Sequence, residues 1–437
     1  MERSAFMKKK LLMVALSIAM AFAAVIAGCA QAGEDSGSVQ QDANALHFAD
    51  GKKMGDGNGS GNGYYRIIPR PDASNNIVFV DYETASEVPL CSRPECQHQD
   101  DTCTSWLPYT AGKGAIFATG DFLYDICFGN QNSEMVEEIG EDALPKIIQM
   151  KRNGSEKETV YTFPASSVIR EGIVYDNSAI YFICDSFENF ERNGNLPERV
   201  LYQYRVSDGT MRTLKVLSAG DEIIGASGRE ILLGTTENAW DLSVDAENLQ
   251  TSVVCCDVDT GEEYALTTHP YLTIGRVYGD VYYLYDPLTT CLSKIQIEPD
   301  AKAEVIRQEV FGEEFRSYPY EAKSIFDNHL FIMYEIPEDK ERGIYTTNFQ
   351  AIDLSSGKPC SIEMRVEKVG GMAPAKQVEI VDETEKQFLV ISSVEYQKVE
   401  IPAGGSSMKL EYPYFRYALI DKQDYYNSNM GAAKIIA

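Results

Sequence analysis

The chain has 437 residues, with 39 Lys and Arg against 66 Asp and Glu, so its formal net charge is −27. A surface this negative repels nucleic acid and anionic phospholipid headgroups, and we exclude both as partners. Two Trp stand beside 26 Tyr, 18 Phe and 33 Gly, a composition typical of many pleated strands joined by turns.

Residues 1–28 have the parts of an export signal: three lysines at 8–10, then a short apolar run over 11–27. The run closes on Ile-Ala-Gly-Cys at 26–29. This sequence resembles the lipobox of bacterial lipoproteins, in which an aliphatic residue and two small ones precede the cysteine. The resemblance implies that Cys29 carries diacylglycerol and becomes the first residue after cleavage. The alternative is an uncleaved transmembrane helix, for which the run lies at the lower end of the spanning range.

A lipidated Cys29 predicts a protein held at the cell membrane, on the extracellular face, with the membrane as a partner through the lipid alone. Two acyl chains anchor a protein stably, whereas one does so only marginally. Ala30 follows the cysteine. In cells with two membranes an aspartate there is the usual signal for retention in the inner membrane, and the sequence lacks it.

Residues 29–63 are rich in Gln, Asp, Ser and Gly and end in a glycine-alternating stretch. Such a composition buries little apolar surface, so the segment is predicted to be a flexible tether behind the lipidated cysteine. Asp56, Asn58 and Ser60 are spaced like the start of a calcium loop. The closing acid is missing, because the twelfth position is Ile67.

Residues 64–437 are predicted to form an all-β domain, a β-propeller of about seven four-stranded blades. A turn pair followed by a strand rich in Tyr, Phe and Ile recurs 48 to 58 residues apart, which is typical of propeller blades. The turn pairs are Asn62-Gly63, Gly120-Asp121, Asp176-Asn177, Gly228-Arg229, Gly279-Asp280, Asp327-Asn328 and Asp382-Glu383. Six or eight blades, or a tandem of β-sandwiches, are the alternatives.

A second strand of each unit ends in an Asp/Ser-Gly turn, as in Cys256-Asp-Val-Asp-Thr-Gly261 and Ile352-Asp-Leu-Ser-Ser-Gly357. With openings such as Gly279-Asp280-Val-Tyr-Tyr, these motifs resemble bacterial lipoprotein propellers of unknown function, which are similar to the propellers of LDL-receptor-related proteins. The resemblance covers most of residues 64–437. It implies a propeller fold and a Gram-positive host, and it implies no activity.

Cys91, Cys96, His98 and Cys103 lie within thirteen residues of one another. The segment Leu-Cys-x-x-Pro-x-Cys-x-His resembles one found in many Gram-positive lipoproteins of this propeller type. Three thiolates and an imidazole have the donors for a closed, structural zinc site. A disulfide between two of the cysteines is the second interpretation, since disulfides form outside the cytoplasm. A loop of reduced thiols is the third.

Ten cysteines occur, and Cys29 leaves nine, an odd number that excludes a complete disulfide framework. Four others lie in apolar runs and are predicted to be small buried hydrophobes. They are Cys127, Cys184, Cys255 and Cys256.

No Gly-x-Ser-x-Gly or His-Glu-x-x-His motif occurs in the sequence. His47, His269 and His329 are predicted to be surface or capping residues. A loop over 186–199 is a candidate ligand surface or an ordinary solvated loop. It carries or adjoins Asp185, Phe187, Glu188, Phe190 and Glu191.

The expected function is therefore a non-enzymatic propeller that binds a glycan, peptide or partner protein at the membrane. An extracytoplasmic carbohydrate-active enzyme, either a hydrolase or a lyase, is the alternative. The expected cofactor is at most one structural zinc.

Overall fold

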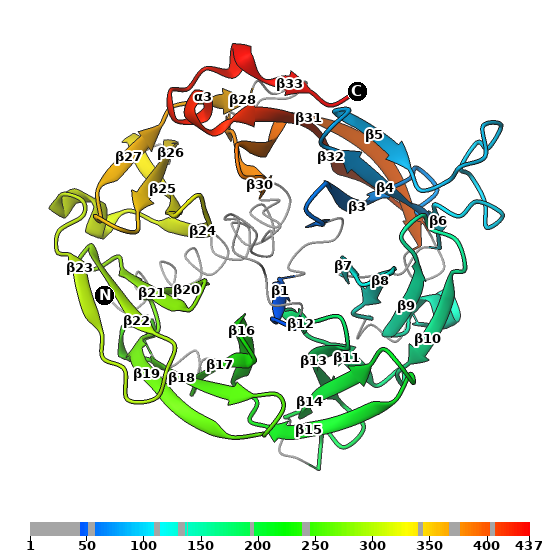
Figure 1. Cartoon of the computed structure of the whole chain (residues 1–437), viewed down its shortest axis with the longest axis horizontal. Helices are drawn as coiled ribbons and strands as arrows, with labels where there is room; N and C mark the ends of the chain where they lie inside the picture. The colour runs from blue at the N-terminus through cyan, green and yellow to red at the C-terminus, as the bar shows by residue number, and fades with distance from the viewer. Residues whose placement is uncertain are drawn as a thin grey trace, which may run out of the picture.

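The computed structural model describes residues 44–50, 57–108, 114–129, 136–137, 139–192, 196–237, 245–339, 344–366, 376–402 and 407–437. Seven antiparallel sheets are arranged as blades around a central axis (Figure 1), so the predicted seven-bladed propeller is confirmed. The predicted signal peptide and Cys29 lie outside the described residues. No helix in the described part of the chain is long and apolar enough to cross a membrane.

The blades follow one another in chain order. The first blade contains β2 (Asn58–Gly59), β3 (Gly63–Pro69), β4 (Asn75–Asp81), β5 (Ser86–Pro89) and β6 (Trp106–Leu107), and the second contains β7 (Gly114–Thr119), β8 (Phe122–Cys127), β9 (Lys146–Lys151) and β10 (Glu158–Thr162). The third blade contains β11 (Ser167–Ile169), β12 (Ile173–Tyr175), β13 (Ala179–Ser186), β14 (Glu198–Arg205) and β15 (Met211–Leu217). The fourth blade contains β16 (Asp221–Ser227), β17 (Glu230–Thr236), β18 (Gln250–Asp257) and β19 (Glu263–Pro270).

The fifth blade contains β20 (Ile274–Tyr278), β21 (Val281–Asp286), β22 (Cys291–Gln296) and β23 (Glu304–Arg307). The sixth blade contains β24 (Tyr320–Phe326), β25 (His329–Asp339), β26 (Ile344–Asp353) and β27 (Pro359–Ile362). The seventh blade contains β30 (Ile380–Glu383), β31 (Gln387–Pro402), β32 (Ser407–Asp421) and β33 (Lys434–Ile435). A small ribbon pairs β28 (Arg365–Val366) with β29 (Lys376–Gln377). Helical pieces are short: η1 (Gly140–Ala143), η2 (Ala246–Asn248), η3 (Glu313–Ser317), α3 (Lys422–Tyr426) and η4 (Met430–Ala432).

The hydrophobic core is divided into layers between neighbouring blades. Successive side chains of a strand point to opposite faces of its sheet, and both faces of a blade are covered here. In β13, Ile180 and Phe182 pack toward the second blade, while Tyr181 and Ile183 pack toward the fourth. This explains the continuous apolar runs of the sequence. It also confirms that Cys127, Cys184, Cys255 and Cys256 are buried.

Six of the seven predicted turn pairs lie at the turn between the first and second strands of a blade. The prediction was wrong for Asp382-Glu383, which lies within β30 and pairs with β31. Gly120, Gly228 and Gly279 have φ values of 55°, 56° and 61°, and Asp327 and Asn328 have 48° and 57°. Positive φ at the tip of a two-residue hairpin matches the twist of the flanking strands and favours Gly, Asn and Asp. Each predicted unit therefore begins one strand too late, because its opening turn lies inside a blade.

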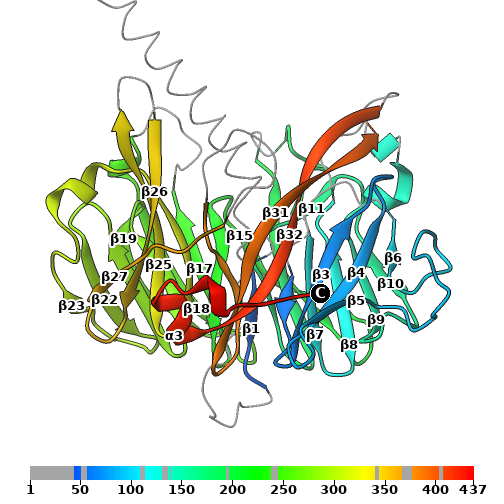
Figure 2. The same ribbon diagram turned by 90° about the horizontal axis from the view of Figure 1, so that it is seen from above.

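The two faces of the propeller differ. The turns between first and second strands are all tight and lie on one face, which we call the tight-turn face. The connections between second and third strands lie on the other, the long-loop face, and include residues 187–192 and 245–249. Two hairpins, β25–β26 and β31–β32, extend beyond the remaining strands on that side (Figure 2).

Strand β1 (His47–Ala49) lies inside the segment that was predicted to be a tether. It pairs with the inner strand β12 of the third blade, with His47 opposite Tyr175 and Ala49 opposite Ile173. Strand β2 likewise pairs with β3. The prediction of a flexible tether is therefore wrong for residues 44–50 and 57–63, and a propeller boundary at residue 64 is too late. Residues 29–43 and 51–56 lie outside the described part.

The ring closes without a strand shared between its ends, because β2–β6 form the first blade and β30–β33 the last. Arg66 links the two. Its side chain is 4 % exposed and pairs with Glu87, and its Nη1 donates to the carbonyl of Phe415 at 3.1 Å. The guanidinium carbon lies 4.4 Å from the ring centre of Tyr417 and 5.3 Å from that of Tyr414.

A buried acid lies in the same interface. Asp382 of the last blade is 3 % exposed and accepts a hydrogen bond from the hydroxyl of Tyr82 in the first blade. A Cβ at Gly59 would lie 2.3 Å from the Asp382 carboxylate, so this close approach requires glycine. Burial raises the pKa of Asp382 to about 7.

We predict that Asp382→Asn makes stability less dependent on pH. A raised carboxyl pKa means that the folded protein holds a proton which the unfolded chain has lost. The wild-type protein should therefore lose stability as the pH rises from about 4 through about 7. Urea unfolding at several pH values should show a smaller loss in the variant, with part remaining because burial also raises the pKa of Asp125 to about 6. Exposed Asp121→Asn should keep the full loss. An unchanged pH slope in Asp382→Asn would contradict the assignment.

Candidate functional site

The Cys/His segment interrupts the outermost strand of the first blade. Strands β5 and β6 both pair with β4, with Val78 opposite Pro89 and Asn76 opposite Trp106. The loop between them, residues 90–105, projects from the outer edge of the blade (Figure 1). It therefore lies away from the central axis of the propeller.

Both ends of this loop are held by one residue of β4. The backbone N–H of Leu90 donates to the carbonyl of Ile77 at 3.0 Å, and the N–H of Ile77 donates to the carbonyl of Ser105 at 2.8 Å. The Thr104 hydroxyl donates to the carbonyl of Leu90 at 2.5 Å. The blade thus fixes the loop ends in place.

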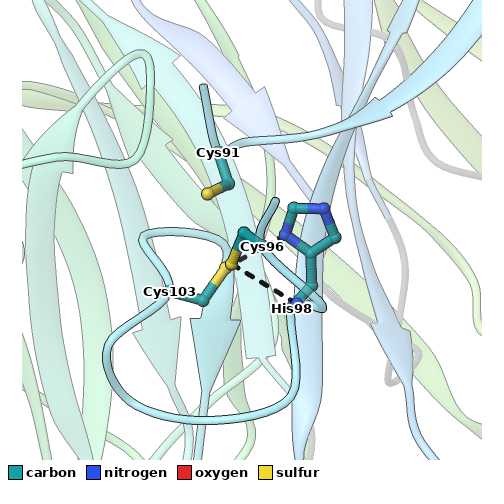
Figure 3. A group of neighbouring side chains, drawn as sticks. All are labelled: Cys91, Cys96, His98 and Cys103. Carbon is teal, nitrogen blue, oxygen red and sulfur yellow. Dashed lines mark hydrogen bonds between the residues drawn. The ribbon is translucent and has the colours of Figure 1, made fainter. Parts of the chain in front are cut away.

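The structure brings all four sequence-predicted ligands together. The Sγ atoms of Cys91, Cys96 and Cys103 and a ring nitrogen of His98 all lie within 4.8 Å of one another. The His98 Nδ1 is 3.2 Å from Cys103 Sγ, and the His98 backbone N–H donates to Cys96 Sγ at 3.4 Å (Figure 3). Ligand atoms of a tetrahedral zinc with bonds of about 2.3 Å lie about 3.7 Å apart, so the group is close to that size.

The electrostatic setting favours thiolate at one end of the cluster. The guanidinium Nη2 of Arg93 lies 3.2 Å from Cys96 Sγ and 2.7 Å from the carbonyl of Thr102. Burial opposes ionisation of Cys91, but the backbone N–H and the side chain of Arg93 outweigh it and lower the pKa to about 6. Burial raises the pKa of Cys103 to about 11. Because thiolate is the metal-binding form, a bound cation would lower that value.

The cluster has the donors and the spacing to hold one metal ion. A four-ligand protein site leaves no coordination position for a substrate, so such an ion would be structural. The nine cysteines in the described residues are free thiols. Oxidation of two of these three cysteines stays the alternative chemistry for the segment.

The predicted acidic loop contributes one structural residue. Asp185 is buried and accepts hydrogen bonds from Arg199, Nε to Oδ1 at 2.7 Å and Nη2 to Oδ2 at 2.8 Å. Glu188 and Glu191 are exposed on the long-loop face. Asp185 therefore holds β13 to β14, and the two glutamates stay candidates for ligand contact.

The prediction from the sequence was wrong for one histidine. His269 was predicted to be a surface or capping residue, but its side chain is buried, with 7 % exposed. Its Nδ1–H donates to the carbonyl of Pro270 at 3.0 Å, and its Nε2 accepts from the Tyr282 hydroxyl at 3.2 Å. Burial lowers the pKa of this imidazole. Because both ring nitrogens have partners, burial costs little.

A cavity of about 480 Å³ opens on the long-loop face where the third, fourth and fifth blades meet. Its lining includes Phe48 and Asp50 at the end of β1, the interblade links near 170–172 and 219–222, and His269, Arg276 and Tyr282. Sequence reasoning missed this cavity. The residues come from separate blades and from the segment predicted to be a tether, so no local motif marks them.

No protein-family model and no curated protein matches the sequence. Solved structures with a similar arrangement include a puromycin hydrolase, at 12% identity and a TM-score of 0.47, covering 87% of this chain and 53% of that one. This chain thus spans about half the length of the hydrolase. An oligogalacturonate lyase solved with manganese has 12% identity and a TM-score of 0.44, covering 84% and 88%.

TolB from Acinetobacter baumannii has 10% identity and a TM-score of 0.33, covering 87% of this chain and 80% of its own. Likenesses this low carry no conclusion about activity. The propeller architecture stands on the strand pairings of the chain itself.

Proposed function

We propose that this chain is a lipid-anchored, extracytoplasmic propeller that binds a glycan, peptide or partner protein without chemical turnover. The lipobox-like sequence ending at Cys29 supports the anchor and, with it, a place on the outer side of the cell membrane. The motif resemblance supports a Gram-positive host. The net charge of −27 argues against nucleic acid as the ligand.

The difference between the two faces carries this proposal. Asn44, the first described residue, lies at the tight-turn face, where its carbonyl accepts from Arg229 of a tight turn. The 15 residues from Cys29 to Asn44 span at most about 50 Å when extended. An anchor at Cys29 would therefore join the propeller at its tight-turn face and leave the long-loop face, with its cavity, free of the tether.

Retention of ligands on glycan and peptide arrays tests the binding function. The full chain, purified in detergent with its lipid, is expected to be retained by at least one ligand class. Heat-unfolded protein serves as the control for nonspecific retention. Failure of the folded protein to be retained on any array would contradict the proposal.

We further propose that the Cys/His cluster holds one structural zinc. The ion would hold the loop over 90–105 together at the edge of the first blade. The loop needs such a link because it has few buried side chains, among them Cys103 and Ser105. A ligand set of one imidazole and three thiolates binds zinc in preference to cations that favour oxygen ligands.

We predict that Cys96→Ser abolishes this zinc. The wild-type chain, purified without chelator, should contain about one zinc per molecule by elemental mass spectrometry, and the variant should contain none, since three remaining ligands hold the ion weakly. Cys360→Ser removes an exposed thiol elsewhere and should keep the zinc. Absence of zinc from the wild type, with two thiols fewer than in reduced protein, would instead establish a disulfide.

A further inference from the structure

The cavity between the third, fourth and fifth blades has the size of a small-molecule site. Its volume of about 480 Å³ lies within the range of about 300–1,000 Å³ found for ligand pockets. It opens on the long-loop face, because the inner strands β16 and β20 begin there and end at the tight turns. Nothing described above gives this cavity a role in the fold.

Arg276 supplies the cavity with a guanidinium that has no ion pair among the described residues, although Asp50, Glu171 and Glu222 also belong to the lining. Its Nε donates to the carbonyl of Lys323 at 3.2 Å and its Nη1 to that of Gly275 at 2.9 Å. A guanidinium has five N–H donors, so three are left after these two bonds. The other arginines differ, because Arg199 is paired with Asp185, and Arg170 lies between Asp185 and Glu222 at 3.8 and 3.6 Å.

Guanidinium recognises carboxylate with paired, charge-assisted hydrogen bonds, which are roughly twice as strong as neutral ones. Two backbone carbonyls hold Arg276 in place, so little side-chain entropy would be lost when a carboxylate binds. The geometry therefore favours an anionic group next to Arg276.

Hydroxyl groups line the same cavity. The Oγ1 atoms of Thr236 and Thr251 lie 2.8 Å apart, and each can accept a further hydrogen bond. The Oγ1 of Thr273 is buried and has no hydrogen-bond partner among the described residues. A buried hydroxyl without a partner is costly, and a ligand hydroxyl would satisfy it.

An aromatic ring and a glycine complete the lining. Tyr271 is 45% exposed, and its ring is available for stacking on an apolar sugar face. Gly275 is required by the wall itself, because a Cβ there would lie 1.8 Å from the Tyr282 hydroxyl oxygen. A ligand that matches this lining carries a carboxylate, several hydroxyls and a flat apolar face.

We propose that this cavity binds a sugar acid, a saccharide carrying a carboxylate, with Arg276 on the carboxylate and the threonines on ring hydroxyls. The inference rests on the proposed binding function and names its ligand class. A peptide carboxylate fits less well, since a peptide offers few hydroxyls for the threonine pair and for Thr273.

Saturation-transfer NMR on the full chain in detergent tests this assignment. The probes are glucuronate and galacturonate, with glucose, galactose and acetate as comparisons. The uronates should bind at least about tenfold more tightly than the matching neutral sugars and than acetate, as expected for a charge-assisted pair. Equal affinity for glucose and glucuronate would overturn the assignment.

Two arginine variants locate the effect. Arg276→Gln should lose the preference for uronates, whereas Arg276→Lys, which keeps the charge, should retain part of it. Arg205→Gln removes the same charge from an exposed position outside the cavity and should change nothing. An unchanged preference in Arg276→Gln would overturn the assignment. If the arrays retained another class of ligand and uronates did not bind, the sugar-acid assignment would be overturned, while the proposed binding function would stand.

Discussion

Arg66→Ala is expected to lower the free energy of unfolding by about 3–5 kcal/mol, as found when one partner of a buried ion pair is removed. The variant leaves Glu87 without its cation and the carbonyl of Phe415 without its donor. It also removes the guanidinium from the faces of Tyr414 and Tyr417. No strand joins the first and last blades, so side-chain contacts such as this one help to close the ring, together with the Tyr82–Asp382 hydrogen bond and backbone hydrogen bonds of Ala437.

Urea unfolding followed by tyrosine fluorescence measures that loss. Arg205→Ala is the matched control, because Arg205 pairs with Asp208 at 3.2 Å while both side chains are nearly half exposed. An exposed pair of this kind contributes about 0–1 kcal/mol. Equal losses in the two variants would show that the contact between first and last blades does not depend on Arg66.

Cys29→Ser is expected to abolish lipidation of the protein. Without the thiol there is no site for the diacylglyceryl group, and a single weak interaction does not hold a protein at a bilayer. Cells fed radiolabelled palmitate should label the wild-type chain and leave the variant unlabelled.

Cys91→Ser is the control for this experiment, since it removes a cysteine outside the lipobox-like sequence and should keep the label. An uncleaved transmembrane helix over residues 11–27 would give a different result. The wild-type chain would then take up no label, and the lipoprotein interpretation would be contradicted.

The fold could be predicted because its signals are local and repeated. Tight hairpins require Gly, Asn or Asp at positive φ, so the pairs at Gly120, Gly228 and Gly279 are visible in the sequence. Strand β1 was missed because its partner, Ile173–Tyr175, is more than a hundred residues away and its three residues show no periodicity. A short strand beside a glycine-rich stretch has the composition of a tether.

The two candidate sites differ in the same way. The cysteines and His98 carry their own chemistry and lie close in the sequence, so their convergence could be expected from spacing. The cavity is assembled from Phe48 to Tyr282 across three blades, and its key residues are an arginine, threonines and glycines of ordinary kinds. Only the closed ring brings Arg276 and Thr273 into one cavity with residues of the third and fourth blades.

The fate of a retained ligand tests the binding function most directly. A glycan or peptide that the full chain retains is incubated with the protein for a day and recovered, and its mass is measured by mass spectrometry. We expect the recovered ligand to have its original mass and to bind again with the same affinity. Shorter fragments or unsaturated sugar ends, absent from a sample kept with heat-unfolded protein, would show an enzyme and contradict the account.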